Sequence, residues 1–128
     1  MIQSLACDFL IRLKNSSLAG NKTMTAPNSQ FCKNIAEVLK KNKYIEDYSI
    51  SEDSRELTLK LHYDNDIPAV SIVKLFSKPG RRWYEKSSSL PWGQSKESLI
   101  IISTSSGLMS QREAKKKGIG GEIIAEIC

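Results

Sequence analysis

The spacing of apolar residues changes once along the chain, and this change constrains the fold more than any other feature. In the first third of the chain, apolar side chains recur at the spacing of an amphipathic helix, as they do at Phe31, Ile35, Val38 and Leu39. Farther on they alternate with polar residues in the way that half-buried strands require, as at Leu57, Leu59, Leu61 and Tyr63. Within 128 residues, enough for one domain or two small lobes, this pattern predicts an α+β fold.

Residues 1–64 are predicted to form a first lobe with the order helix, strand, helix, hairpin. Ser4 is suited to cap a helix that ends between residues 15 and 20, and Pro27-Asn28-Ser29 is suited to start a second helix that stops by Lys43. Strands of this lobe are expected at residues 22–26, 44–50 and 57–63. Residues 51–55 are expected to be the hairpin loop between the last two strands.

Residues 65–128 are predicted to form a second lobe of mostly antiparallel strands with one short helix. The turn formers of residues 64–68 separate the two lobes. Ser110-Gln111-Arg112-Glu113 matches a capping box, so a helix should run to Lys117 and stop at Gly118. Strands are expected at 70–76, 81–86, 99–102 and 122–127, with a turn at 78–80 and a loop at 91–98.

Several classes of protein are excluded by what the chain lacks. The longest aliphatic run, residues 99–102, is four residues, far below the roughly 18 that span a bilayer. The amino end has no basic residues followed by a long apolar run, so no secretory signal is expected. Three cysteines, Cys7, Cys32 and Cys128, lie far apart, which argues against a disulfide framework or a zinc site and favours a reducing compartment. No membrane association, metal or cofactor is predicted.

The positive charge is concentrated in the second half of the chain. The protein has 19 basic and 14 acidic residues; residues 65–128 hold ten of the former and six of the latter. Five basic residues lie between Lys74 and Lys86, around Trp83 and Tyr84. Basic side chains release counterions from phosphates and aromatic rings stack on bases, so this segment favours a polyanion partner. A strand with one solvated face explains the same pattern equally well.

The chain offers little that resembles a catalytic site. His62 is the only histidine, and a lone strand histidine is far more often structural than catalytic. A small hydrolase that uses His62 or Cys32 is the alternative from the enzyme class, although no triad order is present. Gly118-Ile119-Gly120-Gly121 lacks the context of a phosphate-binding loop and is interpreted as a helix stop and a strand entry. We therefore predict a protein without catalytic activity.

Residues 103–109 form the most unusual local segment, Ser103-Thr104-Ser105-Ser106-Gly107-Leu108-Met109. Four hydroxyl groups and a glycine directly after a buried strand give a loop that a ligand can approach closely. Such a loop suits contacts with the backbone, 2′-hydroxyls and base edges of RNA. A polar turn before a helix cap is the other interpretation.

Three stretches in the second lobe together resemble the ribosomal protein S8 family of the small subunit. They are Ser77-Lys78-Pro79-Gly80-Arg81-Arg82-Trp83-Tyr84, residues 103–109, and Gly118-Ile119-Gly120-Gly121-Glu122-Ile123-Ile124. The first lobe is similar to the family through Arg12-Leu13-Lys14-Asn15, Asn21-Lys22, Pro27, Ser29, Ile35-Ala36 and residues 44–48. The resemblance covers nearly the whole chain.

The resemblance implies a primary binder of the central domain of small-subunit ribosomal RNA, without enzymatic activity, that supports assembly of the subunit. It implies that Ser103, Thr104, Ser105 and Gly107 enter the RNA minor groove, flanked by Tyr84, Gly120, Gly121 and Glu122. In this arrangement Glu122 would anchor the loop or accept hydrogen bonds from RNA hydroxyls. Lys78, Arg81 and Arg82 would neutralise phosphates. Lys14, Lys22 and Lys33 are candidates for a second contact, with a solvated surface as the alternative.

The resemblance also implies a cytoplasmic protein in the ribosome, bacterial or organellar, beside other small-subunit proteins and monomeric off the ribosome. The alternative function is that of a free-standing RNA-binding regulator that represses translation of its own messenger RNA. The chain departs from the family pattern at Gln30, Lys43 and Ser106, and residues 92–98 lack the expected glycine-rich loop. The first two departures weaken the expected first-lobe phosphate contact, and Ser106 removes a charge beside the polar loop.

Overall fold

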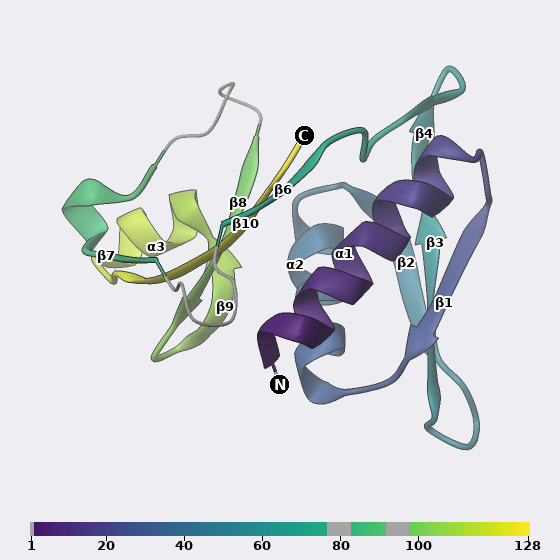
Figure 1. The fold of residues 1–128 in the computed structure, drawn as a ribbon, viewed down its shortest axis with the longest axis horizontal. Helices are drawn as coiled ribbons and strands as arrows, with labels where there is room; N and C mark the ends of the chain where they lie inside the picture. Colours follow the sequence, from purple (N-terminus) through teal and green to yellow (C-terminus); the bar gives the residue numbers. More distant parts are fainter. Residues whose placement is uncertain (1, 77–82, 92–97) are drawn as a thin grey trace.

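The chain folds into four layers, in the order sheet, helices, sheet, helix (Figure 1). The computed structural model describes residues 2–76, 83–91 and 98–128. Three helices and antiparallel sheets of three, five and two strands are present within these residues. The predicted α+β class is therefore confirmed.

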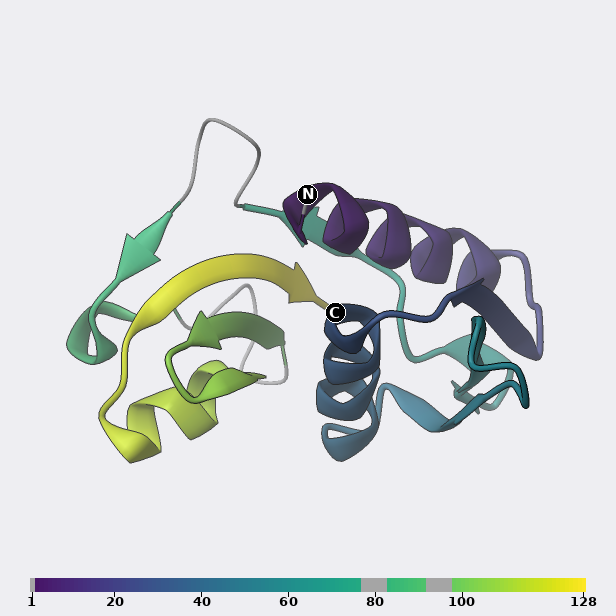
Figure 2. The same ribbon diagram turned by 90° about the horizontal axis from the view of Figure 1, so that it is seen from below.

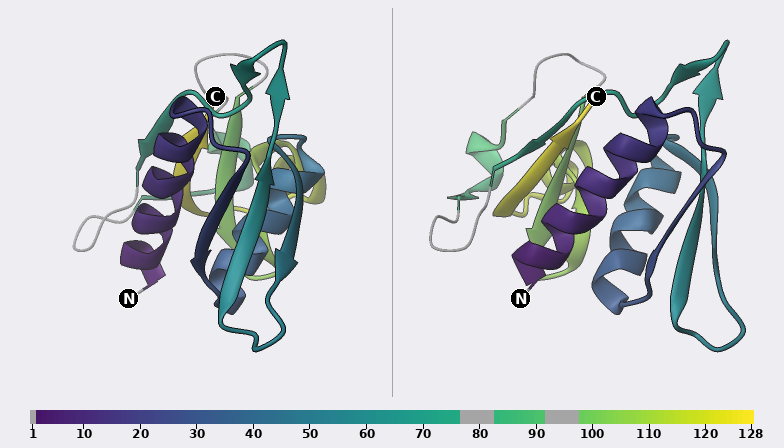
Figure 3. Two further views of the ribbon diagram at one scale, coloured as in Figure 1. Left: turned by 90° about the vertical axis from the view of Figure 1, so that its right-hand side faces the viewer. Right: turned by 45° about the vertical axis from the view of Figure 1, so that its right-hand side comes forward.

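The first lobe has the predicted order of elements. Helix α1 (Ile2–Leu18), strand β1 (Thr23–Pro27), helix α2 (Gln30–Lys41) and strands β2 (Ile45–Ile50) and β3 (Glu56–Leu61) follow one another. The sheet order is β1-β3-β2, all antiparallel, and both helices cover one of its faces (Figure 3). The side chain of Ser29 caps α2 by accepting from the amide of Cys32 at 3.1 Å. One prediction was wrong: α1 begins at Ile2, so Ser4 lies within the helix.

A small hairpin connects the two lobes. Strands β4 (Tyr63–Asp64) and β5 (Ile67–Pro68) pair through a two-residue turn. Asn65 and Asp66 in this turn have φ angles of 50° and 66°, which Asn and Asp tolerate better than most residues. The predicted lobe boundary after residue 64 falls inside this hairpin; the division of the chain into lobes 1–64 and 65–128 stays a prediction.

The second lobe is built around its last strand, β10 (Gly121–Ile127). β10 pairs antiparallel with β6 (Val73–Leu75), with β7 (Tyr84–Glu85) and with β8 (Leu99–Thr104). The outer strand β9 (Gly107–Ser110) pairs with β8. A 3-10 helix, η1 (Ser87–Ser89), follows β7, and helix α3 (Gln111–Lys117) follows β9. Figure 2 shows β10 as a long curved strand whose end approaches the first lobe.

The helix signals in the second lobe are confirmed. The Ser110 hydroxyl accepts from the amide of Glu113 at 3.2 Å, and Gly118 ends α3 with a φ angle of 69°. The carboxylate of Glu113, predicted to close the capping box, accepts from Lys41 of the first lobe.

Three strand predictions for this lobe need correction. Residues 70–76 contribute only Val73–Leu75 as a strand, paired with residues 125–127. The flanking Ile72 and Phe76 also hydrogen-bond to the backbone of Cys128 and Ile124. The described part of the predicted strand at 81–86 contributes only Tyr84–Glu85, which faces Glu122 and Gly121. Residues 103–109, predicted to be a loop, form the end of β8, a two-residue turn and most of β9.

The hydrophobic core extends across both lobes. One cluster joins Leu10, Leu39 and Leu59 of the first lobe to Leu99, Ile101 and Ile127 of the second. A second cluster, with Ile100, Ile102 and Ile123, lies between the second sheet and α3. Both faces of β8 are thus buried, which explains its uninterrupted apolar run. Within the part of the chain that the structure describes, no helix is both long and apolar enough to cross a bilayer.

Candidate nucleic-acid interface

Strand β10 brings three of the predicted contact segments together. Glu122 pairs with Ser103 of β8 on one side and with Tyr84 of β7 on the other. Paired residues of antiparallel strands lie about 5 Å apart, so these three residues form a row across the sheet. The residues come from three segments separated by up to 38 positions in the chain. The sequence segments that were assigned to one RNA interface therefore meet at one place in the fold.

The Ser105-Ser106 turn forms the exposed end of the β8–β9 hairpin. Thr104 pairs with Gly107, and the Thr104 hydroxyl donates to the carbonyl of Gly107 at 2.8 Å and accepts from the amide of Ser106 at 3.1 Å. Gly107 has a φ angle of 110°, which favours glycine. Thr104 thus shapes the turn from within, while Ser105 is exposed to solvent at its tip.

Gly120 and Gly121 allow the close approach of neighbouring strands. A Cβ atom on Gly120 would lie 2.3 Å from the carbonyl oxygen of Glu85, and one on Gly121 would lie 2.2 Å from that of Ser103. Both contacts are with backbone atoms, so a side chain at either position would push the sheet apart. These two residues were predicted to contact RNA; the structure gives them an additional role in holding Tyr84 and Ser103 next to β10.

Tyr84 and Glu122 differ greatly in their exposure. Tyr84 is 59% exposed, which leaves its ring accessible for stacking. Glu122 is 8% exposed and lies between β7 and β8. It stands in the middle of the row, and its two predicted roles, anchoring the loop or accepting from RNA hydroxyls, stay predictions.

The predicted basic contacts are distributed over several places. Lys78, Arg81 and Arg82 lie outside the described residues, as do Trp92 and its neighbours up to residue 97. The first-lobe candidates stand on separate segments, with Lys14 on α1, Lys22 just before β1 and Lys33 on α2. Lys22 is exposed, and the other two are half-buried. No role for these three is set by the structure.

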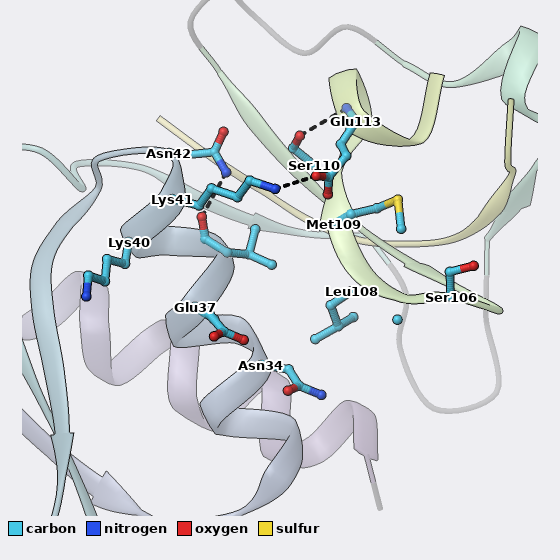
Figure 4. A pocket seen from close by; sticks show the side chains of 12 residues that line it. Asn34, Glu37, Lys40, Lys41, Asn42, Ser106, Leu108, Met109, Ser110 and Glu113 are labelled. Atoms are coloured by element: carbon cyan, nitrogen blue, oxygen red, sulfur yellow. Dashed lines mark hydrogen bonds and ion pairs between the residues drawn. The ribbon is translucent and has the colours of Figure 1, made fainter. Parts of the chain in front are cut away.

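A cleft between the lobes borders the same hairpin (Figure 4). It has a volume of about 850 Å³ and is lined by α2 residues such as Asn34 and Lys41 and by Ser106, Gly107 and Glu113 of the second lobe. The ammonium group of Lys41 forms an ion pair with Glu113 across the cleft. This hydrogen bond lowers the pKa of Glu113 from its ordinary value of 4.5. The cleft therefore contains a charge pair that links the lobes.

The two residues of the enzyme alternative, Cys32 and His62, do not form a recognisable catalytic arrangement in the described part of the structure. Cys32 is 3% exposed and packed in the core. His62 is half-buried, and its carbonyl accepts from the amide of Ala69. Among residues 2–76, 83–91 and 98–128, no group of three His, Cys, Asp or Glu side chains is placed to hold a metal ion.

The structure has a polar groove beside Tyr84 that the sequence analysis did not predict. The groove is lined by Tyr84, Glu85, Lys86, Ser87, Ser89, Gly118, Gly120 and Gly121. Lys86 was counted in the basic segment but not assigned a contact, and the run Lys115-Lys116-Lys117 next to Gly118 was not considered. The run precedes Gly118 in the chain, but none of its three lysines lines the groove.

Comparison with known proteins identifies the family of the chain. The family model described as ribosomal protein S8 matches residues 4–128. A protein named small ribosomal subunit protein uS8, from Bifidobacterium longum subsp. infantis, is 45% identical over 122 residues, with 92% of each chain covered. Proteins of the same name from Dichelobacter nodosus and Spiroplasma kunkelii are each 38% identical over 128 residues, and each match covers 99% of this chain. The matches cover 99% of the Dichelobacter protein and 98% of the Spiroplasma protein. The chain belongs to the ribosomal protein S8 family.

Proposed function

We propose that this protein is a structural constituent of the small ribosomal subunit that binds the central domain of its ribosomal RNA. The observation that carries the proposal is the row formed by Tyr84, Glu122 and Ser103 beside the exposed hairpin. The names of the relatives supply the ribosomal context. In this function the protein orders RNA for later assembly steps and catalyses no reaction.

The hairpin is suited to recognition of RNA by shape. The wide minor groove of an RNA helix displays 2′-hydroxyl groups and base edges. The Ser103 and Ser105 hydroxyls donate and accept hydrogen bonds over a short reach, and Gly107 has no side chain to keep the RNA backbone away. The hydrogen bonds of Thr104 hold the turn in one conformation before RNA arrives, which lowers the entropic cost of binding.

The flanking residues supply affinity. The exposed ring of Tyr84 offers a stacking surface, and Glu122 supports the strands on which Tyr84 and Ser103 stand. Lys78, Arg81 and Arg82 are proposed to neutralise phosphates, which makes the affinity fall as salt is added. Lys14, Lys22 and Lys33 remain candidates for a second contact from the first lobe.

The test is binding to a transcript of the central domain of its own small-subunit ribosomal RNA, with an unrelated hairpin as competitor. Ser105→Trp places a bulky side chain at the exposed tip of the turn, where it should obstruct the minor groove. We expect its affinity to fall about tenfold or more, equivalent to about 1.4 kcal/mol, while its thermal unfolding is unchanged. Ser49→Trp, at an exposed position on β2, is the matched control and should bind like the wild type.

Unchanged affinity of Ser105→Trp would contradict the proposed interface. Wild-type binding that the unrelated hairpin displaces would reduce the basic surface to a general polyanion patch and contradict the function itself.

The alternative is a free-standing regulator of its own messenger RNA. Shape recognition would accept any RNA that presents the same irregular helix, so the interface would be the same. Sedimentation of cell extracts distinguishes the two functions. We propose a cytoplasmic protein that sediments with small subunits beside other ribosomal proteins and is a monomer when released; a protein found mainly in RNA-free or messenger-bound fractions would favour the regulator.

A further inference from the structure

The polar groove beside Tyr84 lies at the junction of β7, η1 and the link between α3 and β10. Its volume is about 890 Å³, and its lining includes Tyr84, Glu85, Lys86, Ser87, Ser89 and Gly118. Gly121 also lines the groove. It precedes Glu122, the residue that pairs with Ser103, and it pairs with Glu85. The groove thus begins where the row of Tyr84, Glu122 and Ser103 ends.

The walls of the groove present groups that bind phosphate. Lys86 is exposed, and none of the ion pairs found in the described part of the chain involves it. Ser87 and Ser89 stand on the same side of η1 as the groove, whereas Ser88, also exposed, does not line it. An ammonium group with two hydroxyl donors is a donor set suited to phosphate oxygens.

The charge around the groove is positive. The lining itself contains one basic residue, Lys86, and one acidic residue, Glu85. The neighbouring residues 111–117 add four basic residues and one acidic one. Glu113 is paired with Lys41, and the Glu85 carboxylate accepts from the indole nitrogen of Trp83 at 2.8 Å. Both acidic side chains therefore have partners, and the net field at the groove attracts an anion.

We propose that this groove is a phosphate subsite that holds the RNA backbone one step beyond the hairpin contact. Lys86 pairs with a phosphodiester, Ser87 and Ser89 donate hydrogen bonds to its oxygens, and the strand passes over the Tyr84 ring on its way from Ser103. The inference rests on the proposed function and assigns contacts to η1, a segment outside the motifs that carry the family resemblance.

The first test compares two lysine variants in the RNA titration across salt. Lys86→Ala removes the phosphate partner, so its affinity should fall about threefold or more at moderate salt and the slope of log affinity against log salt should flatten by about one unit. Lys60→Ala removes the same charge from an exposed position on β3 and should leave both quantities nearly unchanged.

The second test uses the three serines of η1. The double variant Ser87→Ala/Ser89→Ala should weaken binding without changing the salt slope, because the hydroxyls carry no charge, and Ser88→Ala should bind like the wild type. Thermal unfolding of each variant checks that the fold is intact.

The outcomes separate this inference from the function on which it rests. If Ser105→Trp loses affinity but Lys86→Ala matches Lys60→Ala, or the double variant matches Ser88→Ala, the groove is not a phosphate subsite and the RNA function stands. If the wild type does not discriminate its ribosomal RNA from the competitor, both proposals fail together.

Discussion

At the scale of single residues, two glycines of the stretch 118–124 are required for different physical reasons. Gly118 has a left-handed φ angle and open space around its Cβ position, whereas Gly121 has backbone atoms of Ser103 where a Cβ would be. The same residue type is therefore required for conformation in one case and for contact distance in the other.

Alanine substitutions should separate these two requirements. Gly121→Ala should lower the free energy of unfolding by about 2 kcal/mol or more, because the strand beside it must move, and should also weaken RNA binding by shifting Ser103. Gly118→Ala should cost about 1 kcal/mol through its φ angle alone and should affect RNA binding less. Urea unfolding and the RNA titration measure both quantities; equal effects of the two variants on binding would contradict the packing role.

Among the elements, α3 is attached to the sheet by a buried polar side chain. Gln111 is 1% exposed, accepts from the amide of Ile100 at 2.8 Å and donates to the carbonyl of Ser98 at 2.8 Å. It thereby supplies partners to backbone groups at the start of β8 that would otherwise be buried without them.

Replacement of Gln111 by an apolar residue should lower the free energy of unfolding, although buried positions usually favour apolar side chains. Gln111→Leu removes both partners at once, so we expect a loss of about 2 to 4 kcal/mol in unfolding free energy. Arg112→Leu changes the exposed neighbour on the same helix and should change stability by less than about 0.5 kcal/mol. A Gln111→Leu protein as stable as the wild type in urea would show that water replaces the amide.

Elements with a strong local signal were predictable from the sequence. The caps of α2 and α3 and the alternation of Leu57, Leu59 and Leu61 follow from neighbouring residues alone. The outer strand β9 was not predictable, because Gly107–Ser110 has no alternating pattern and depends on pairing with β8. For the candidate site, the polar hairpin was found from composition, whereas the groove at η1 requires residues 84–89 and 118–121 to meet in space.

Across the whole molecule, the two lobes are joined by a shared core and by an ion pair over the cleft. Leu39 of α2 and Ile101 of β8 belong to one cluster, and Lys41 pairs with Glu113 on the other side. The partners are 72 positions apart in the chain, so this pair could not be predicted from a local sequence pattern.

The ion pair should make part of the stability depend on pH. Because the pKa of Glu113 in the folded protein lies below 4.5, its contribution is complete above that value and is lost as pH falls through the folded pKa. Glu113→Gln should therefore be less stable than the wild type near neutral pH, by up to about 1 kcal/mol, and the difference should shrink toward zero in acid. Urea midpoints at both pH values measure it, with Glu56→Gln, an exposed carboxylate on β3, as the control; a difference that persists in acid would assign the effect to packing.

The central place of β10 also sets the order in which the protein becomes functional during synthesis. Strands β6, β7 and β8 all pair with residues 121–127, which are made after every one of them. Until those last residues emerge, the hairpin and Tyr84 have no common support and the shared core lacks Ile124, Ala125 and Ile127. A chain that stops before residue 121 therefore exposes unpaired strand edges, which favour aggregation and proteolysis, and lacks the proposed RNA interface. Tyr84 and Ser103 therefore share one supporting strand only after residues 121–127 have been made.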